Sequence, residues 1–174
     1  TKRIENIGVI GSAMGEEQLG DFFDLRLSKD SFSLTERLVF LGEIERKNDF
    51  ESQTPMGKVV IKGTEQDDYL LDDSALVYKS SAGLVIITGC SHAGICNIIR
   101  HAGEVCGDER IVDIIGGFHL LNPSPRQLQG TVKFMKNLGL GEIHPCHCTD
   151  LTSKIALAEV VRLKEVGVGL SLEY

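Results

Sequence analysis

The stretch LVIITGCSHAG (84–94) begins with an apolar run rich in Val and Ile and then delivers a histidine just past a glycine. Two later stretches repeat this arrangement, IVDIIGGFHL (111–120) and LGEIHPCHCT (140–149). Apolar runs of this length, stopped by Gly or Cys, are typical of buried strands. The sequence therefore places an imidazole at the end of each of three successive strands.

Segments with helical periodicity separate and follow these strands. One runs from Ile95 to Gly107, one from the N-cap Ser124, in a capping box with Gln127, to Gly139, and one from Thr149 or Asp150 to about Lys164. Strands that alternate with helices are typical of an α/β layer, in which ligands collect at one edge of the sheet. We therefore expect the three histidines to converge there.

The three strand-end histidines are His92, His119 and His147, separated by 27 and 28 residues. Neutral imidazole is the commonest protein ligand for transition metals, so this repeat indicates a metal site. The two remaining histidines, His101 and His144, do not follow the strand-end pattern, and a structural role is favoured for both. For His144, support of a metal ligand is the alternative.

The motifs GCSHAGICN, IIGGFHLL and HPCHCT, preceded by DDSALVYKSSAGLVIITG, resemble the C-terminal half of a metallo-β-lactamase superfamily hydrolase. The branch that they resemble comprises the dihydropterin-methyl-aminobenzene ribofuranosyl phosphate synthase-like proteins. The resemblance is strong over residues 68–150. It implies the C-terminal half of a four-layer αββα sandwich.

The resemblance also implies roles for the three histidines. His92 would complete the ligand set of a first metal, and His147 would bind a second. The superfamily usually places a bridging carboxylate between them, but the matching segment here is GGFHL. His119 is then the candidate at that position, and it either binds one metal or faces the substrate.

The superfamily's main ligand motif, His-x-His-x-Asp-His, does not occur before residue 92, and the chain opens at Thr1 without Met. We therefore expect residues 1–174 to be a partial metallo-β-lactamase-like domain that lacks the half carrying this motif. The rest of the site would come from the missing N-terminal half or from a partner chain. The fragment alone should be inactive.

Composition narrows the classes of partner and compartment. The 174 residues are 42% apolar and 25% charged, as in one globular domain, and the net charge of −7 gives no electrostatic footprint for nucleic acid. No apolar stretch is long enough to span a membrane. Five unpaired cysteines indicate a reducing, cytoplasmic compartment. For Cys90, Cys146 and Cys148, packing is favoured over metal ligation by thiolate.

The part of the chain before the first histidine is harder to interpret. We expect strands at 4–11, 38–44 and 59–62 and a hairpin of 74–79 with 84–89, with an exposed loop at 46–58 and an acidic loop after residue 62. The adjacent Asp72 and Asp73 more often cap a turn than bind metal. We expect 38–44, 59–62, 74–79 and 84–89 to share one sheet. Because LVII is apolar on both faces of its strand, this sheet should need a second cover, so that the chain associates with itself or with the absent segment.

The function that these patterns favour is metal-dependent hydrolysis of a small molecule, with one or two Zn²⁺ ions in the intact site. A phosphate-bearing or pterin-like substrate fits the branch that the motifs resemble. The alternative is a non-catalytic binding or interaction module that completes a site only with a partner segment. A site built on the clustered thiols is a third hypothesis.

Overall fold

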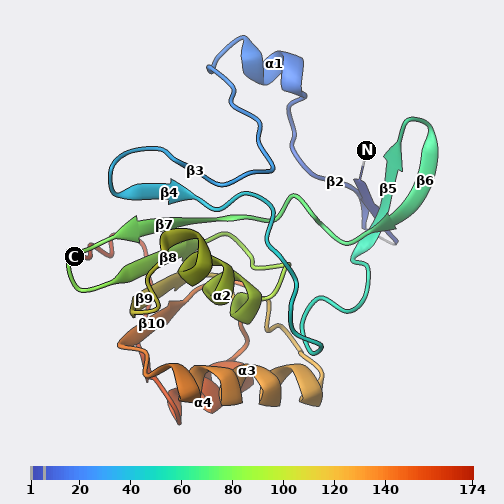
Figure 1. The fold of residues 1–174 in the computed structure, drawn as a ribbon. Helices are drawn as coiled ribbons and strands as arrows, with labels where there is room; N and C mark the ends of the chain where they lie inside the picture. Colours follow the sequence, from blue (N-terminus) through green and yellow to red (C-terminus); the bar gives the residue numbers. More distant parts are fainter. Residues whose placement is uncertain (1, 6) are drawn as a thin grey trace.

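The computed structural model describes residues 2–5 and 7–174, and this part of the chain forms two β-sheets and four helices (Figure 1). The fold class is α/β, as expected. The strands are β1 (Lys2–Ile4), β2 (Gly8–Ile10), β3 (Phe32–Ser33), β4 (Leu38–Phe40), β5 (Gly57–Ile61), β6 (Thr64–Asp68), β7 (Ala75–Lys79), β8 (Leu84–Thr88), β9 (Ile111–Gly116), β10 (Glu142–Pro145) and β11 (Arg162–Leu163). The helices are α1 (Glu16–Gly20), α2 (Ile95–Cys106), α3 (Pro125–Leu138) and α4 (Leu151–Ala158).

The larger sheet has seven strands in the order β11-β10-β9-β8-β7-β4-β3. Strands β8 to β11 are parallel, whereas β3, β4 and β7 pair antiparallel. The three expected strand-end runs form β8, β9 and β10, which are neighbours in this sheet. Their carboxyl ends therefore meet at one edge, where the histidine loops begin.

The helices that alternate with these strands begin and end close to the sequence signals. Helix α2 ends at Gly107 in the left-handed conformation, and α3 starts at Ser124, whose hydroxyl accepts the Gln127 N–H at 3.2 Å, and ends at Gly139. Helix α2 contacts β7, β8 and α3, and α3 contacts α4. Their apolar faces join the strands in one buried core that includes Ile86, Ile98 and Ile114.

The smaller sheet is antiparallel, in the order β2-β1-β5-β6, and corrects three expectations. Residues 4–11 were expected to form one strand, but Ile4 pairs with Gly8 in a tight β1–β2 hairpin. The acidic segment after residue 62 was expected to be a loop, yet it contains β6, which pairs with β5 along its length. Strand β5 therefore belongs to this second sheet and not beside β7, and the hairpin β5–β6 stands to one side of the larger sheet in Figure 1.

The C-terminal segment differs from the expected long helix. Helix α4 ends at Ala158, and the chain then forms β11 and a tail without helix or strand. The tail residues Val166, Leu170 and Tyr174 line a hollow with Val85 and Ile87 on the larger sheet. The tail thus covers part of the second apolar face, although Ile87 keeps 40% of its surface exposed. Within the described residues, no helix is long and apolar enough to cross a membrane.

Candidate metal centre

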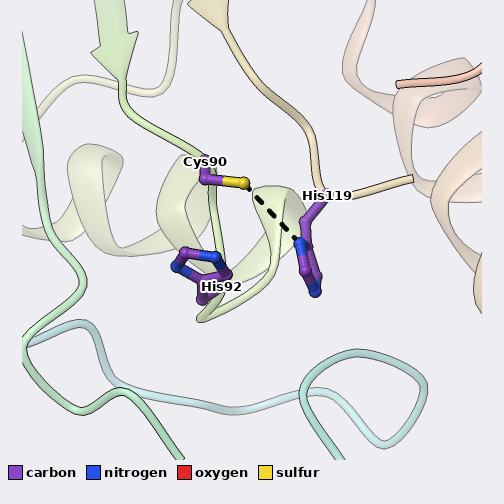
Figure 2. A group of neighbouring side chains, drawn as sticks. All are labelled: Cys90, His92 and His119. Carbon is purple, nitrogen blue, oxygen red and sulfur yellow. Dashed lines mark hydrogen bonds between the residues drawn. The ribbon is translucent and has the colours of Figure 1, made fainter. Parts of the chain in front are cut away.

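The three strand-end histidines lie at the same edge of the larger sheet, after β8, β9 and β10. His92 and His119 face one another with ring centroids 4.8 Å apart and the rings nearly perpendicular. Figure 2 shows both rings beside Cys90, whose Sγ is 3.7 Å from His119 Nδ1. One potential ligand atom from each of these three side chains lies within 4.8 Å of the others.

His147 lies in a second group of potential ligands, with Cys90 and Cys148, whose ligand atoms are also within 4.8 Å of one another. The Sγ atoms of Cys90 and Cys148 are 2.9 Å apart, and both cysteines are free thiols. The sequence favoured packing for these two cysteines. The structure places their sulfur atoms close to ligand atoms of the histidines, with Cys90 in both groups, and packing stays a prediction.

The backbone at the edge of the sheet is held in an uncommon conformation. Ser91, His119 and Cys148 all have positive φ angles, of 60°, 51° and 48°. Such angles are unusual for residues other than glycine and cluster at functional sites, where the surrounding structure must hold them in place. Ser91 shows how they are held, since its hydroxyl donates to the Gly117 carbonyl at 2.6 Å.

Gly117 leaves room for the second group. A Cβ at this position would lie 2.6 Å from Cys148 Sγ and 2.8 Å from His147 Nε2, far inside normal contact distance. The two donor atoms therefore pack directly on the backbone of the β9 loop. A glycine is required at this position by space and not by its φ angle.

Asp73 supports His92 from behind. Its Oδ1 is 3.4 Å from His92 Nδ1, and its Oδ2 accepts a hydrogen bond of 2.9 Å from the Ala93 N–H. The sequence favoured a turn role for both Asp72 and Asp73. Asp73 does lie in a turn, with its N–H donating to Leu70, but its side chain is only 8% exposed and reaches the site. Asp72 is 69% exposed and pairs with Lys2.

The loop at 46–58 is anchored to the site by a buried carboxylate, although the sequence indicated a simple exposed loop. Glu51 is 1% exposed and accepts hydrogen bonds from the backbone N–H groups of Cys96 and Asn97, at 3.0 and 3.1 Å. These are free N–H groups of the first turn of α2, whose own N-cap, Gly94, supplies no side chain. Burial raises the pKa of Glu51 above its ordinary value, in spite of these hydrogen bonds.

His119 is held in the form that binds metal. Burial lowers its pKa, and the neighbouring His92 lowers it further, so the neutral imidazole is favoured. Helix α3 also contacts this residue, because the Gln127 side chain donates to the His119 carbonyl at 3.3 Å. Half of the expected capping box therefore forms, through the Ser124 hydroxyl, while the Gln127 side chain contacts the histidine loop.

His101 and His144 lie outside both groups. His101 Nε2 is 3.1 Å from the Leu41 carbonyl oxygen, on the helix side of the sheet. His144 is buried beside Asp113, with Nδ1 2.7 Å from the carboxylate, and the Tyr174 hydroxyl donates to the same carboxylate. Each also lies among other possible ligands, His101 with Glu45 and Glu104 and His144 with Asp113 and Glu142, so a structural role for both stays a prediction.

The donors at the edge suit a transition metal. Imidazole nitrogen and thiolate sulfur are ligands that zinc takes in proteins, at about 2.0–2.1 and 2.3 Å. The residues that could hold such an ion are Cys90, His92 and His119 in one group and Cys90, His147 and Cys148 in the other. The sequence signal for the cysteines is their place beside the strand-end histidines, whereas Glu51 has none, because it is distant in sequence from the residues that it contacts.

Curated proteins and a solved structure are similar to the chain. No protein-family model matches the chain. It is 33% identical over 126 residues to a 7,8-dihydropterin-6-methyl-4-(β-D-ribofuranosyl)-aminobenzene-5'-phosphate synthase of Methanocaldococcus jannaschii, covering 71% of this chain and 43% of that protein. It is 26% identical over 137 residues to an uncharacterized protein of the same organism, covering 79% of this chain and 50% of that protein.

A solved structure is similar to the chain in both fold and sequence. The crystal structure of Tm1679, described as a metal-dependent hydrolase of the β-lactamase superfamily, superposes with a TM-score of 0.76 and 30% sequence identity. The match covers 87% of this chain and 58% of that chain. The chain spans about half the length of the curated relatives that it matches.

Proposed function

Because the chain is related in sequence and in fold to the metallo-β-lactamase superfamily, we propose that it carries part of the active site of a metal-dependent hydrolase. The observation that carries this proposal is the convergence of His92, His119 and His147 with two thiols at one sheet edge. We assign zinc as the metal, because nitrogen and sulfur donors suit it and oxygen-preferring Mg²⁺ and Ca²⁺ do not.

In this proposal each histidine has a defined task. His92 and His147 are metal ligands in separate groups. His119 is a third ligand, in the group with Cys90 and His92. A bound zinc ion supplies Lewis acidity, which lowers the pKa of water and polarises a scissile bond. The chain's own contribution is to position the His92 ring through Asp73, and to favour the neutral ring of His119 through burial, which lowers its pKa.

The substrate that we propose is a small molecule that bears a phosphate or a pterin-like ring. The printed name of the Methanocaldococcus jannaschii relative contains both groups, which supports this class. That relative is named a synthase and the Tm1679 structure a hydrolase. Both proteins are similar to this chain. We choose hydrolysis, because metal ions held at the edge of a sheet can activate water and polarise a bond.

The site is completed, in our proposal, by residues outside the 174-residue chain. The three histidines and two thiols leave each group with three donors, and the chain spans about half of its curated relatives. The remaining ligands would come from the rest of the polypeptide or from a partner chain. A non-catalytic module is the second candidate, favoured by the partly exposed apolar face at Ile87, against which a partner could pack.

The metal content of variants tests the proposal. In the intact protein, His92→Ala and His147→Ala should each remove bound zinc and nearly all hydrolysis, because each removes a ligand. His101→Ala is the matched control, since His101 belongs to neither edge group and its Nε2 lies 3.1 Å from the Leu41 carbonyl oxygen. Full zinc content in both site variants, measured by atomic absorption, would contradict the assignment.

Activity of the chain alone is the second measurement. The 174 residues should hydrolyse phosphodiester and lactone test substrates slowly or not at all, because each group lacks donors. Robust turnover by the purified chain would contradict the incomplete site, and zinc-free protein that still binds a partner would favour the interaction module.

A further inference from the structure

Cys90 occupies a special place among the potential ligands. Of the groups found in the described part of the chain, those at the sheet edge are Cys90 with His92 and His119, and Cys90 with His147 and Cys148. Cys90 is the residue common to both. A donor atom in this place can contact two metal ions at once, provided that it carries enough negative charge to hold them together.

The distances within the first group suit a common metal. Cys90 Sγ is 3.7 Å from His119 Nδ1. A sulfur and a nitrogen ligand on one tetrahedral zinc ion lie about 3.5 Å apart, given bond lengths of about 2.3 and 2.0–2.1 Å. Cys90 and His119 could therefore ligate one ion with little movement of either side chain.

The second group needs a small adjustment. The Sγ atoms of Cys90 and Cys148 are 2.9 Å apart, whereas two thiolates on one zinc ion lie about 3.8 Å apart. A disulfide, at about 2.05 Å, would require a similar movement in the opposite direction. His147 favours the metal over the disulfide. Its ligand atom lies within 4.8 Å of both sulfurs, where it can bind a metal with them but takes no part in a disulfide.

The surroundings of Cys148 also suit a charged sulfur. The backbone N–H of His119 donates to Cys148 Sγ at 3.3 Å, and Gly117 leaves the space that the sulfur and the His147 ring occupy. Hydrogen bonds from N–H groups favour an ionised acceptor. The β9 loop thus presents both a donor and an opening to this sulfur, and the thiol's own contact with the Cys90 carbonyl oxygen, at 3.5 Å, would be given up when the metal binds.

We propose that Cys90 provides a thiolate shared by two adjacent metal positions, one completed by His92 and His119 and the other by His147 and Cys148. This inference rests on the proposed function and extends it. Each thiol loses one proton to solvent as its sulfur–metal bond forms, and no electron is transferred. A thiolate carries the negative charge that an imidazole lacks, so Cys90 is a better bridge between two cations than His119.

Cobalt titration tests the proposal, because Co²⁺ takes tetrahedral sites and its bonds to thiolate give an intense near-ultraviolet charge-transfer absorption. The intact protein is titrated with Co²⁺ in the presence of a phosphine reductant that keeps both thiols reduced. Wild-type protein should show the thiolate absorption and bind two ions. Cys148→Ser should lose one ion and part of the absorption, and Cys90→Ser should weaken both positions at least about tenfold.

Cys146→Ser is the matched control. Cys146 and Cys148 flank His147 in the sequence, but Cys146 Sγ donates to the His144 carbonyl, and neither edge group among the described residues includes it. This variant should bind two ions with unchanged absorption. Circular dichroism of each variant separates loss of metal from loss of the fold. Cys90→Ala is a second substitution at the shared position, for use if Cys90→Ser does not fold.

The outcomes separate this inference from the function on which it rests. Wild-type protein that binds no Co²⁺ would contradict the metal centre itself. Binding without thiolate absorption, or binding that Cys90→Ser leaves intact while His92→Ala removes it, would overturn the shared thiolate and leave a histidine site. Effects of Cys148→Ser equal to those of Cys90→Ser on both ions would also overturn it, since only Cys90 belongs to both groups.

Discussion

Asp73 contacts both the ring of His92 and the backbone that follows it. One carboxylate oxygen lies 3.4 Å from His92 Nδ1, and the other accepts the Ala93 N–H at 2.9 Å. A carboxylate on one ring nitrogen leaves the other free for a metal and fixes the direction of the ring. Asp73 is thus a positioning residue for the candidate ligand His92.

Asp73→Asn tests this relationship. The amide keeps the size of the side chain but removes the charge, so zinc affinity should fall about 10–100-fold while the fold persists. Competition with a chromophoric chelator measures the affinity. Asp72→Asn is the control, because Asp72 is exposed and pairs with Lys2. Equal losses in the two variants would show that Asp73 acts only through the turn.

Gly117→Ala should disturb the second group by crowding alone. The new Cβ would lie 2.6 Å from Cys148 Sγ and 2.8 Å from His147 Nε2, so both donors must move. We expect the His147-side metal to be lost and the free energy of unfolding to fall by about 1–3 kcal/mol, as for other overpacked sites. Urea unfolding and metal analysis measure the two effects.

Gly89 provides the comparison for this experiment. It lies at the same edge, at the end of β8, and a Cβ there would meet no atom within 4 Å. Gly89→Ala should therefore retain both metals. Unchanged metal content in Gly117→Ala would mean that His147 and Cys148 are not held at the positions that the structure gives them.

His119→Ala distinguishes the two roles left open for this residue. Because His119 Nδ1 is 3.7 Å from Cys90 Sγ and the ring faces His92, we expect the intact protein to lose one metal equivalent. Metal stoichiometry and steady-state kinetics are measured together. Full metal content with a raised KM would instead make His119 a substrate contact.

Glu51 should make stability depend on pH. Its pKa is raised in the folded state by burial, so the fold favours the protonated carboxyl. Its contribution to stability is fully present below the unfolded value of about 4.3 and is lost as pH rises through the folded pKa. Glu51→Gln removes this titration, and the stability of wild type relative to the variant should decline from pH 4 to pH 8.

Urea unfolding of both proteins across this pH range gives the comparison. Glu36→Gln, at an exposed site, serves as the control substitution. A stability difference between wild type and Glu51→Gln that stays constant with pH would show that Glu51 does not titrate in this range. A difference that grows with pH would show that its hydrogen bonds to α2 outweigh burial.

The parts of the fold that local patterns specify agreed with the sequence. Apolar runs with Val and Ile gave β8, β9 and β10, and Ser124, Pro125 and Gly139 gave the limits of α3. The errors lie where a distant partner decides. Residues 64–68 carry five charged or polar side chains with no strand pattern, yet they form β6 because β5 pairs with them.

The sequence by itself determined that three histidines follow three parallel strands, because strand and helix periods are local and parallel strands end at one edge. Only the tertiary structure decided which donors meet. Cys90 and Cys148 are 58 residues apart in sequence, and Glu51 is 45 residues from Cys96, so their contacts depend on how loops fold over the sheet edge. Side-chain packing sets such distances, and no local pattern in the chain encodes them.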